Sequence, residues 1–128
     1  MSLDFITGKR WELSWQEDTD LLTLGSGVLV KVYRQDAAKG RLDLLVKFPP
    51  GYVEPAHAHD SEHSIVVLEG VQVVDGVSLH AGDYCFGGRE VIHGPFEYPE
   101  GCVVFASFTG VSAQHRYPGS PGGEIGHG

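Results

Sequence analysis

Residues 51–70 read GYVEPAHAHDSEHSIVVLEG and place three histidines, His57, His59 and His63, within a stretch of seven residues. Side chains of an extended strand alternate between its two faces, so separations of two and four turn all three imidazoles to one side. Glu62 falls on the opposite side. The spacing therefore predicts a face on which three imidazoles converge.

Apolar side chains continue on the histidine side of this expected strand. Ile65 and Val67 have the same parity as the histidines, so we expect the shared face to be the interior of the molecule. Imidazoles inside an apolar core need partners, and one divalent metal can satisfy several of them together. Histidines near a surface loop are the alternative, which three residues at strand spacing make the weaker interpretation.

The rest of the chain also reads as short strands between turns. The 128 residues include 18 Gly and 7 Pro, and the only weak helical candidate, 35–39, would end at Gly40. Asp75-Gly76 between two apolar runs is typical of a type I′ hairpin. The expected strands are 21–34, 41–48, 63–68, 71–74, 77–79, 84–86, 91–92 and 102–109. Strands at this spacing predict an antiparallel sandwich or barrel.

Charge and hydropathy exclude several classes of protein. Nine Lys and Arg against 17 Asp and Glu give a net charge of −8, which argues against binding to nucleic acid or to an anionic membrane surface. The longest aliphatic runs have about four residues, far short of the roughly 20 that cross a bilayer. No signal peptide is apparent, and the two cysteines are expected as free thiols in a reducing cytoplasm.

The length predicts one domain over 1–117, followed by a tail at 118–128 that holds five Gly and two Pro. Val66 and Leu68 should point outward from the histidine strand. An exposed apolar strip of that kind favours a homodimer.

Two stretches resemble the signatures of the cupin superfamily. Residues 51–70 resemble Gly-x5-His-x-His-x3–4-Glu-x6-Gly, with matches at Gly51, His57, His59 and Gly70. Residues 82–93 resemble the start of Gly-x5-Pro-x-Gly-x2-His-x3-Asn. There Gly82 and His93 match, while Gly88, Glu90 and Glu97 replace the usual Pro, Gly and Asn. The resemblance spans about 40–110 and is closest in scale to small, single-domain RmlC-like cupins.

The resemblance implies an all-β, antiparallel jelly-roll barrel, or double-stranded β-helix, whose metal ligands point inward. It carries His57, His59 and His93 over as ligands and places His63 where cupins usually have Glu. Three arrangements are open: a four-histidine site with His63, a three-histidine site with His63 turned aside, or a bulge that swings Glu62 inward.

A site of this kind would hold one divalent transition metal per chain, from Fe, Zn, Ni or Cu, with Fe or Zn favoured. Without a glutamate ligand its charge stays near +2, which favours anionic ligands such as enolates. Gln72, Tyr84, Phe48 and Phe105 are candidates for the pocket wall. His115 and His127, near the tail, have no expected role in the site.

The resemblance extends to small cupins with three-histidine sites, such as the β-diketone-cleaving dioxygenases. It suggests a mononuclear non-haem oxidoreductase that acts on a small enolisable or anionic substrate. One alternative is a non-catalytic zinc-binding or ligand-sensing module, similar to the zinc-binding cupin domains of some anti-sigma factors. Another is a metal-dependent isomerase or lyase.

Overall fold

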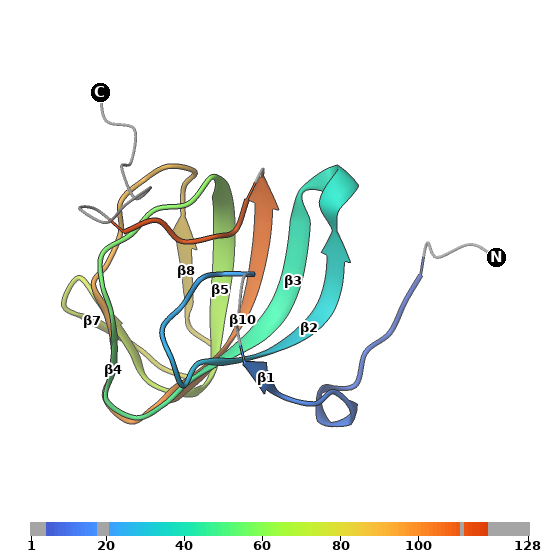
Figure 1. The fold of residues 1–128 in the computed structure, drawn as a ribbon. Coiled ribbons are helices and arrows are strands. Elements are labelled where there is room, and N and C mark those ends of the chain that lie inside the picture. Colours follow the sequence, from blue (N-terminus) through green and yellow to red (C-terminus); the bar gives the residue numbers. More distant parts are fainter. Residues whose placement is uncertain (1–4, 18–20, 111, 118–128) are drawn as a thin grey trace.

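The computed structural model describes residues 5–17, 21–110 and 112–117, and it consists mainly of antiparallel β-strands (Figure 1). A six-stranded sheet has the order β1-β2-β3-β10-β5-β8, and a four-stranded sheet has the order β4-β9-β6-β7. The strands are β1 (Gln16–Glu17), β2 (Leu29–Asp36), β3 (Arg41–Phe48), β4 (Tyr52–Glu54), β5 (Ser61–Gly70), β6 (Gln72–Val74), β7 (Val77–Leu79), β8 (Tyr84–Gly87), β9 (Phe96–Tyr98) and β10 (Cys102–Gly110). The predicted antiparallel all-β architecture is confirmed.

The core forms on the inner face of the larger sheet, where alternating apolar residues meet. Strand β3 buries Leu42, Leu44, Val46 and Phe48, as its alternation predicts. Strand β10 pairs with β3 on one side and with β5 on the other. On β5, Val67 is fully buried below the histidines, so the apolar side of that strand is the interior of the molecule.

Two turns show why the sequence has glycine where it does. In the β6–β7 hairpin both Asp75 and Gly76 have positive φ, 52° and 75°, which is the conformation that a type I′ turn requires. At the end of β5, a Cβ on Gly70 would lie 2.1 Å from the carbonyl oxygen of Gly101. Only glycine allows this close approach of β5 to the start of β10.

The helical content is as low as expected. Two 3-10 turns, Arg10–Glu12 and Ala37–Lys39, are the helices of the described part of the chain, and neither is long or apolar enough to cross a membrane. The second lies within the weak candidate 35–39 and ends at Gly40, whose φ is 62°. Both cysteines are free thiols, as predicted.

The chain between β8 and β10 differs from the prediction. Val91 and Ile92, expected as a strand, are each 54% exposed and lie in an irregular segment between the turn at Arg89 and Glu90 and the isolated bridge at His93. The strand is instead Phe96–Tyr98, whose three residues stand between Pro95 and Pro99. So short a run, bounded by two residues that cannot donate a backbone hydrogen bond, gives no periodicity to recognise.

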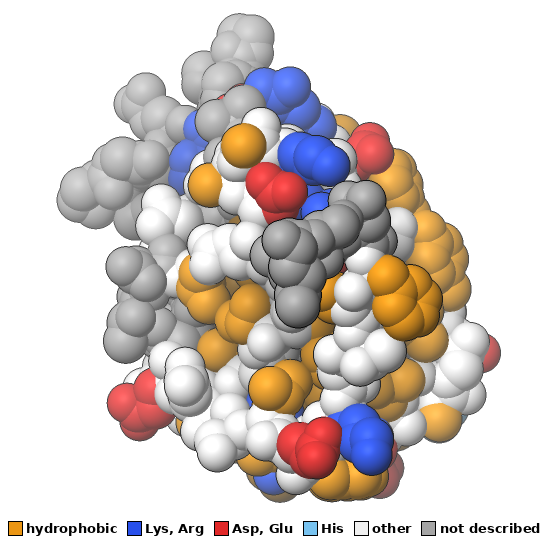
Figure 2. Space-filling model, turned by 90° about the vertical axis from the view of Figure 1, so that its right-hand side faces the viewer, with side chains coloured by type: hydrophobic (Ala, Val, Ile, Leu, Met, Phe, Trp, Pro, Cys, Tyr) orange, Lys and Arg blue, Asp and Glu red, His pale blue; other side chains and the backbone are white. Residues whose placement is uncertain are grey.

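The homodimer and the tail stay predictions. Val66 and Leu68 are half-buried on the side of β5 opposite His63, Ile65 and Val67. On the face of the molecule shown in Figure 2, apolar side chains are interspersed with charged and polar ones. The predicted tail, 118–128, and its His127 lie outside the described residues.

Candidate metal centre

The structure brings the four predicted histidines together in the interior. His57 and His59 lie on the segment between β4 and β5, His63 lies on β5, and His93 lies between β8 and β9. The first three are at most 4% exposed, and His93 is half-buried. Two backbone hydrogen bonds, from the N–H of His57 to the carbonyl of His93 at 3.0 Å and the reverse at 2.9 Å, hold the two segments side by side.

Backbone carbonyls fix the tautomers of two of these rings. The Nδ1 atom of His59 donates to the carbonyl oxygen of Ser61 at 2.8 Å, and that of His93 donates to Val91 at 2.8 Å. A carbonyl can only accept, so the proton is on Nδ1 and the Nε2 atom of each ring carries the lone pair. Proteins usually orient the histidine ligands of a metal in this way, with one ring nitrogen hydrogen-bonded away from the site and the other free to bind the metal.

Three of the rings form a group that we name the triad: His59, His63 and His93. One ring nitrogen from each lies within 4.8 Å of the others. The Nε2 atoms of His59 and His93 and the Nδ1 atom of His63 are buried without a hydrogen-bond partner among the described residues. Buried ring nitrogens without a partner are costly, and one cation between them would satisfy all three when His63 presents the lone pair of Nδ1. The triad therefore fits a transition metal that prefers imidazole.

Burial also sets the protonation state of the rings. Desolvation lowers the pKa of His57 and His59 to about 3 and that of His63 to about 2, against an ordinary value of 6.5. The same cause lowers the pKa of His93. Neutral imidazole, the form that binds a metal, is therefore the form present near pH 7.

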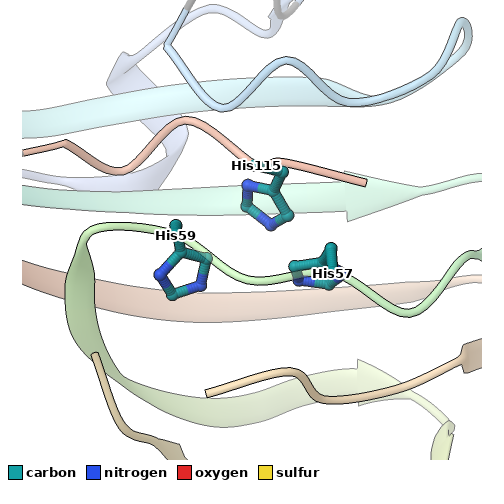
Figure 3. Close-up of side chains that lie close together, drawn as sticks. All are labelled: His57, His59 and His115. Carbon is teal, nitrogen blue, oxygen red and sulfur yellow. The ribbon is translucent and has the colours of Figure 1, made fainter. Parts of the chain in front are cut away.

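His115 joins a second group of three with His57 and His59 (Figure 3). Its ring packs on His57 with 4.2 Å between centroids, and its side chain is 6% exposed. His115, for which no role in the site was expected, thus lies beside the predicted ligands. The segment after β10 returns across the interior, where the N–H of His115 donates to the carbonyl of Leu22 at 2.8 Å. No pattern in the sequence around His115 predicts this contact with residues far away in the chain.

Glu54 was not among the predicted site residues, although it ends β4 beside the histidines and is 3% exposed. Its Oε2 atom lies 3.2 Å from Nε2 of His115 and 3.7 Å from Nε2 of His57. Burial raises the pKa of Glu54 to about 7, although His57 and His93 and a hydrogen bond from Tyr98 pull it down. The available sequence signal was a carboxylate on a strand just before the histidine motif.

Glu62 is exposed, with its neighbours Ser61 and His63 buried. The arrangement in which a bulge swings Glu62 inward is therefore not the one in the structure.

The predicted pocket residues divide into two pairs. Gln72 and Phe48 line an interior cavity of about 30 Å³ that also touches Glu54, His57, His63 and His115. Tyr84 is 55% exposed on β8, where its hydroxyl lies 2.9 Å from that of Ser64. Phe105 lies across the sheet from the cavity, because its neighbours on β10, Val104 and Ala106, take the inner face. Tyr84 and Phe105 thus do not line the cavity.

Gly87 on β8 provides a test of the triad's geometry. A Cβ at this position would lie 2.6 Å from Cε1 of His63, so Gly87→Ala should displace that ring. We expect metal affinity to fall about 10- to 100-fold, as it does when the support of a ligand is lost, in a competition titration with a chromogenic chelator. Gly88→Ala is the matched control, because its Cβ would meet only Val91, at 3.3 Å. Equal affinities for the two variants would contradict the assignment of His63.

Comparisons with known proteins identify the family and the fold. The family model of the ChrR cupin-like domain matches residues 12–112, and no curated protein matches the sequence significantly. A proposed acetylacetone dioxygenase from Methylibium petroleiphilum superposes with a TM-score of 0.76 at 16% identity, over 99% of this chain and 89% of its own. An acetylacetone dioxygenase from Acinetobacter johnsonii gives 0.72 at 13% identity, over 98% and 83%.

A third solved structure, the anti-sigma factor ChrR in complex with SigE from Rhodobacter sphaeroides, gives a TM-score of 0.58 at 22% identity. The similarity covers 77% of this chain and 51% of that chain. At these identities the solved structures show the fold, and they confirm the predicted cupin jelly roll.

Proposed function

Because the chain belongs to the family of ChrR cupin-like domains, we propose that it is a metal-dependent enzyme that oxidises a small enolisable substrate with molecular oxygen. The observation that carries the proposal is the triad, in which three buried imidazole nitrogens converge with no carboxylate among them. The likeness of the fold to acetylacetone dioxygenases supports the choice of reaction class.

The triad would hold the metal through His59, His63 and His93. A divalent transition metal bound there would supply open coordination positions and Lewis acidity. Three neutral ligands leave its charge near +2, so the site would favour an anionic enolate over the neutral ketone. The preference for the enolate would thus come from a ligand set that contains no carboxylate.

Aromatic side chains hold the ligand rings and keep water from them. Phe108 lies 5.3 Å from His59 and 5.2 Å from His63, measured between ring centroids, and Phe96 lies 5.7 Å from His93 with its ring at 89°. Both phenylalanines are buried. A dry, low-dielectric setting strengthens the electrostatic stabilisation of a developing anion.

A non-catalytic metal-binding module is a second candidate, and the size of the cavity favours it. The cavity that reaches His63 has a volume of about 30 Å³, room for about one water molecule, so an organic substrate can occupy it only if side chains of its wall, such as Leu22 and Leu24, move aside. The family's namesake, ChrR, is an anti-sigma factor.

Oxygen uptake separates the two candidates. The protein, purified anaerobically without chelator or affinity nickel and loaded with Fe(II), is expected to consume one O2 per molecule of pentane-2,4-dione or a related diketone. His63→Ala should abolish uptake, while His80→Ala, at an exposed turn, should leave it unchanged. Protein with iron bound at the triad that consumes no oxygen with any diketone would favour the non-catalytic module.

A further inference from the structure

We propose that Glu54, His57 and His115 form a second cation site beside the triad. The three residues come from the end of β4, from the segment before β5 and from the segment after β10. Neither the cupin signature nor the triad uses Glu54 or His115. The site would therefore add a metal position to the one on which the proposed function depends.

Backbone hydrogen bonds fix the tautomers of both imidazoles. The Nδ1 atom of His57 donates to the carbonyl oxygen of Pro55 at 2.9 Å, and that of His115 donates to Ala113 at 3.1 Å. In the neutral rings, the Nε2 atoms then carry lone pairs. These atoms face Oε2 of Glu54 at 3.7 and 3.2 Å. Three acceptors thus surround one small volume, an arrangement that is repulsive without a positive charge between them.

The carboxylate of Glu54 is held toward that volume. The buried Tyr98 hydroxyl, which helps to lower the pKa of Glu54, accepts a hydrogen bond from Nε2 of Gln72 at 3.1 Å. The Oε2 atom is buried and accepts no hydrogen bond from the described residues. A buried carboxylate that lacks compensation is costly, and a cation held with the two imidazoles would supply it.

The donor set and its spacing suit a transition metal. Two imidazoles and one carboxylate form the donor set of many non-haem iron sites. Ligand atoms at about 2.0–2.2 Å from one ion lie roughly 3 Å from each other. The distance of 3.2 Å between Oε2 of Glu54 and Nε2 of His115 already fits, and the 3.7 Å from Oε2 to Nε2 of His57 would have to shorten only slightly. Glu54, His57 and His115 use none of the triad's donor atoms, so both positions could be filled at once.

The second cation should bind more weakly than the first. His59 offers a nitrogen within 4.8 Å of those of His57 and His115 as well as within the triad, so the two positions are neighbours. Two divalent cations at close range repel each other in a low dielectric, and the single carboxylate offsets only part of this. A proton shared between Glu54 and His115 would also relieve the repulsion, and it is the alternative that the experiment must exclude.

Cation stoichiometry tests the proposal. Metal-free protein titrated with Co²⁺, followed by visible absorption and by native mass spectrometry, is expected to bind two ions per chain, the second more weakly. Glu54→Gln should bind one. The amide keeps the shape and the contact with Tyr98, and its N–H can donate to Nε2 of His115, so the metal-free variant should melt no lower than the wild type. His115→Phe, which keeps a ring against His57, should also bind one.

Two controls separate this site from the triad. His63→Ala should bind one ion, at the weaker position, and Glu62→Gln, which changes an exposed carboxylate, should bind two. A single ion per saturated wild-type chain, or two ions in both Glu54→Gln and His115→Phe, would overturn the proposal in favour of a shared proton or of another position. One ion with oxygen uptake intact would leave the proposed function standing, whereas two ions without uptake would leave only the second site.

Discussion

His59→Ala is expected to remove the tightly bound metal. The ring of His59 is fully buried, and its Nε2 atom is one of the unpartnered nitrogens of the triad. Its loss leaves two ligands on a metal that takes at least four. Loss of a supporting contact alone costs about 10- to 100-fold in affinity, so the loss of a ligand should exceed about 100-fold. Plasma mass spectrometry after gel filtration would show the metal retained per chain.

Glu62→Ala is the matched control for that experiment, because Glu62 lies on the exposed side of β5 next to His63. This variant should keep the metal content of the wild type. Metal loss in Glu62→Ala, or full retention in His59→Ala, would contradict the assignment of the inner face as the metal face.

The metal-free protein is expected to lose stability steeply below about pH 6.5. His57, His59 and His63 have native pKa values of about 3, 3 and 2, whereas in the unfolded chain they return to the ordinary 6.5. Between these values the unfolded state binds protons that the native state does not. Stability therefore falls as the pH falls.

Glu54 acts in the opposite direction. Its native pKa of about 7 exceeds the ordinary 4.5, so between pH 7 and 4.5 the native state holds a proton that the unfolded chain has lost. This offsets about one of the three histidine protons. Near pH 5.5 the free energy of unfolding should change by about 2–3 kcal/mol per pH unit.

Urea unfolding of metal-free protein at pH 7.5, 6.5 and 5.5 measures this dependence. His63→Phe should show a shallower dependence by about one proton, because one of the buried imidazoles is gone. The same stability at all three pH values would show that these rings are hydrated and not buried in the metal-free state. Bound metal should move the transition to lower pH, because it competes with protons for the ring nitrogens.

Local periodicity accounts for what the sequence could predict. The alternation over 41–48 places Leu44 and Val46 in the core. His57, His59 and His63 are all buried, as their spacing predicts, although only His63 lies on a strand and Ala58 is buried as well. The Asp75-Gly76 turn follows from backbone sterics alone. Each of these inferences needs only neighbours within about ten residues.

Long-range contacts decide the rest. Glu54 and His115 meet because β4 ends beside a segment some sixty residues away in sequence, and nothing in the local pattern of either links the two. On β10, Val104 and Ala106 lie on the inner face, so Phe105 lies on the outer one. Alternation alone does not tell which of these two sets of residues faces inward. The resemblance places His57 with His59 and His93, whereas in the structure the ring nitrogens of His57 group with those of His59 and His115, a detail of side-chain direction that spacing along the chain does not determine.

Anomalous scattering from crystals of metal-loaded protein tests the central claim most directly. We predict a peak about 2.0–2.2 Å from Nε2 of His59, Nδ1 of His63 and Nε2 of His93, the distance at which imidazole binds a first-row transition metal. Fully loaded crystals in which these three nitrogens lack a common peak would contradict the metal centre.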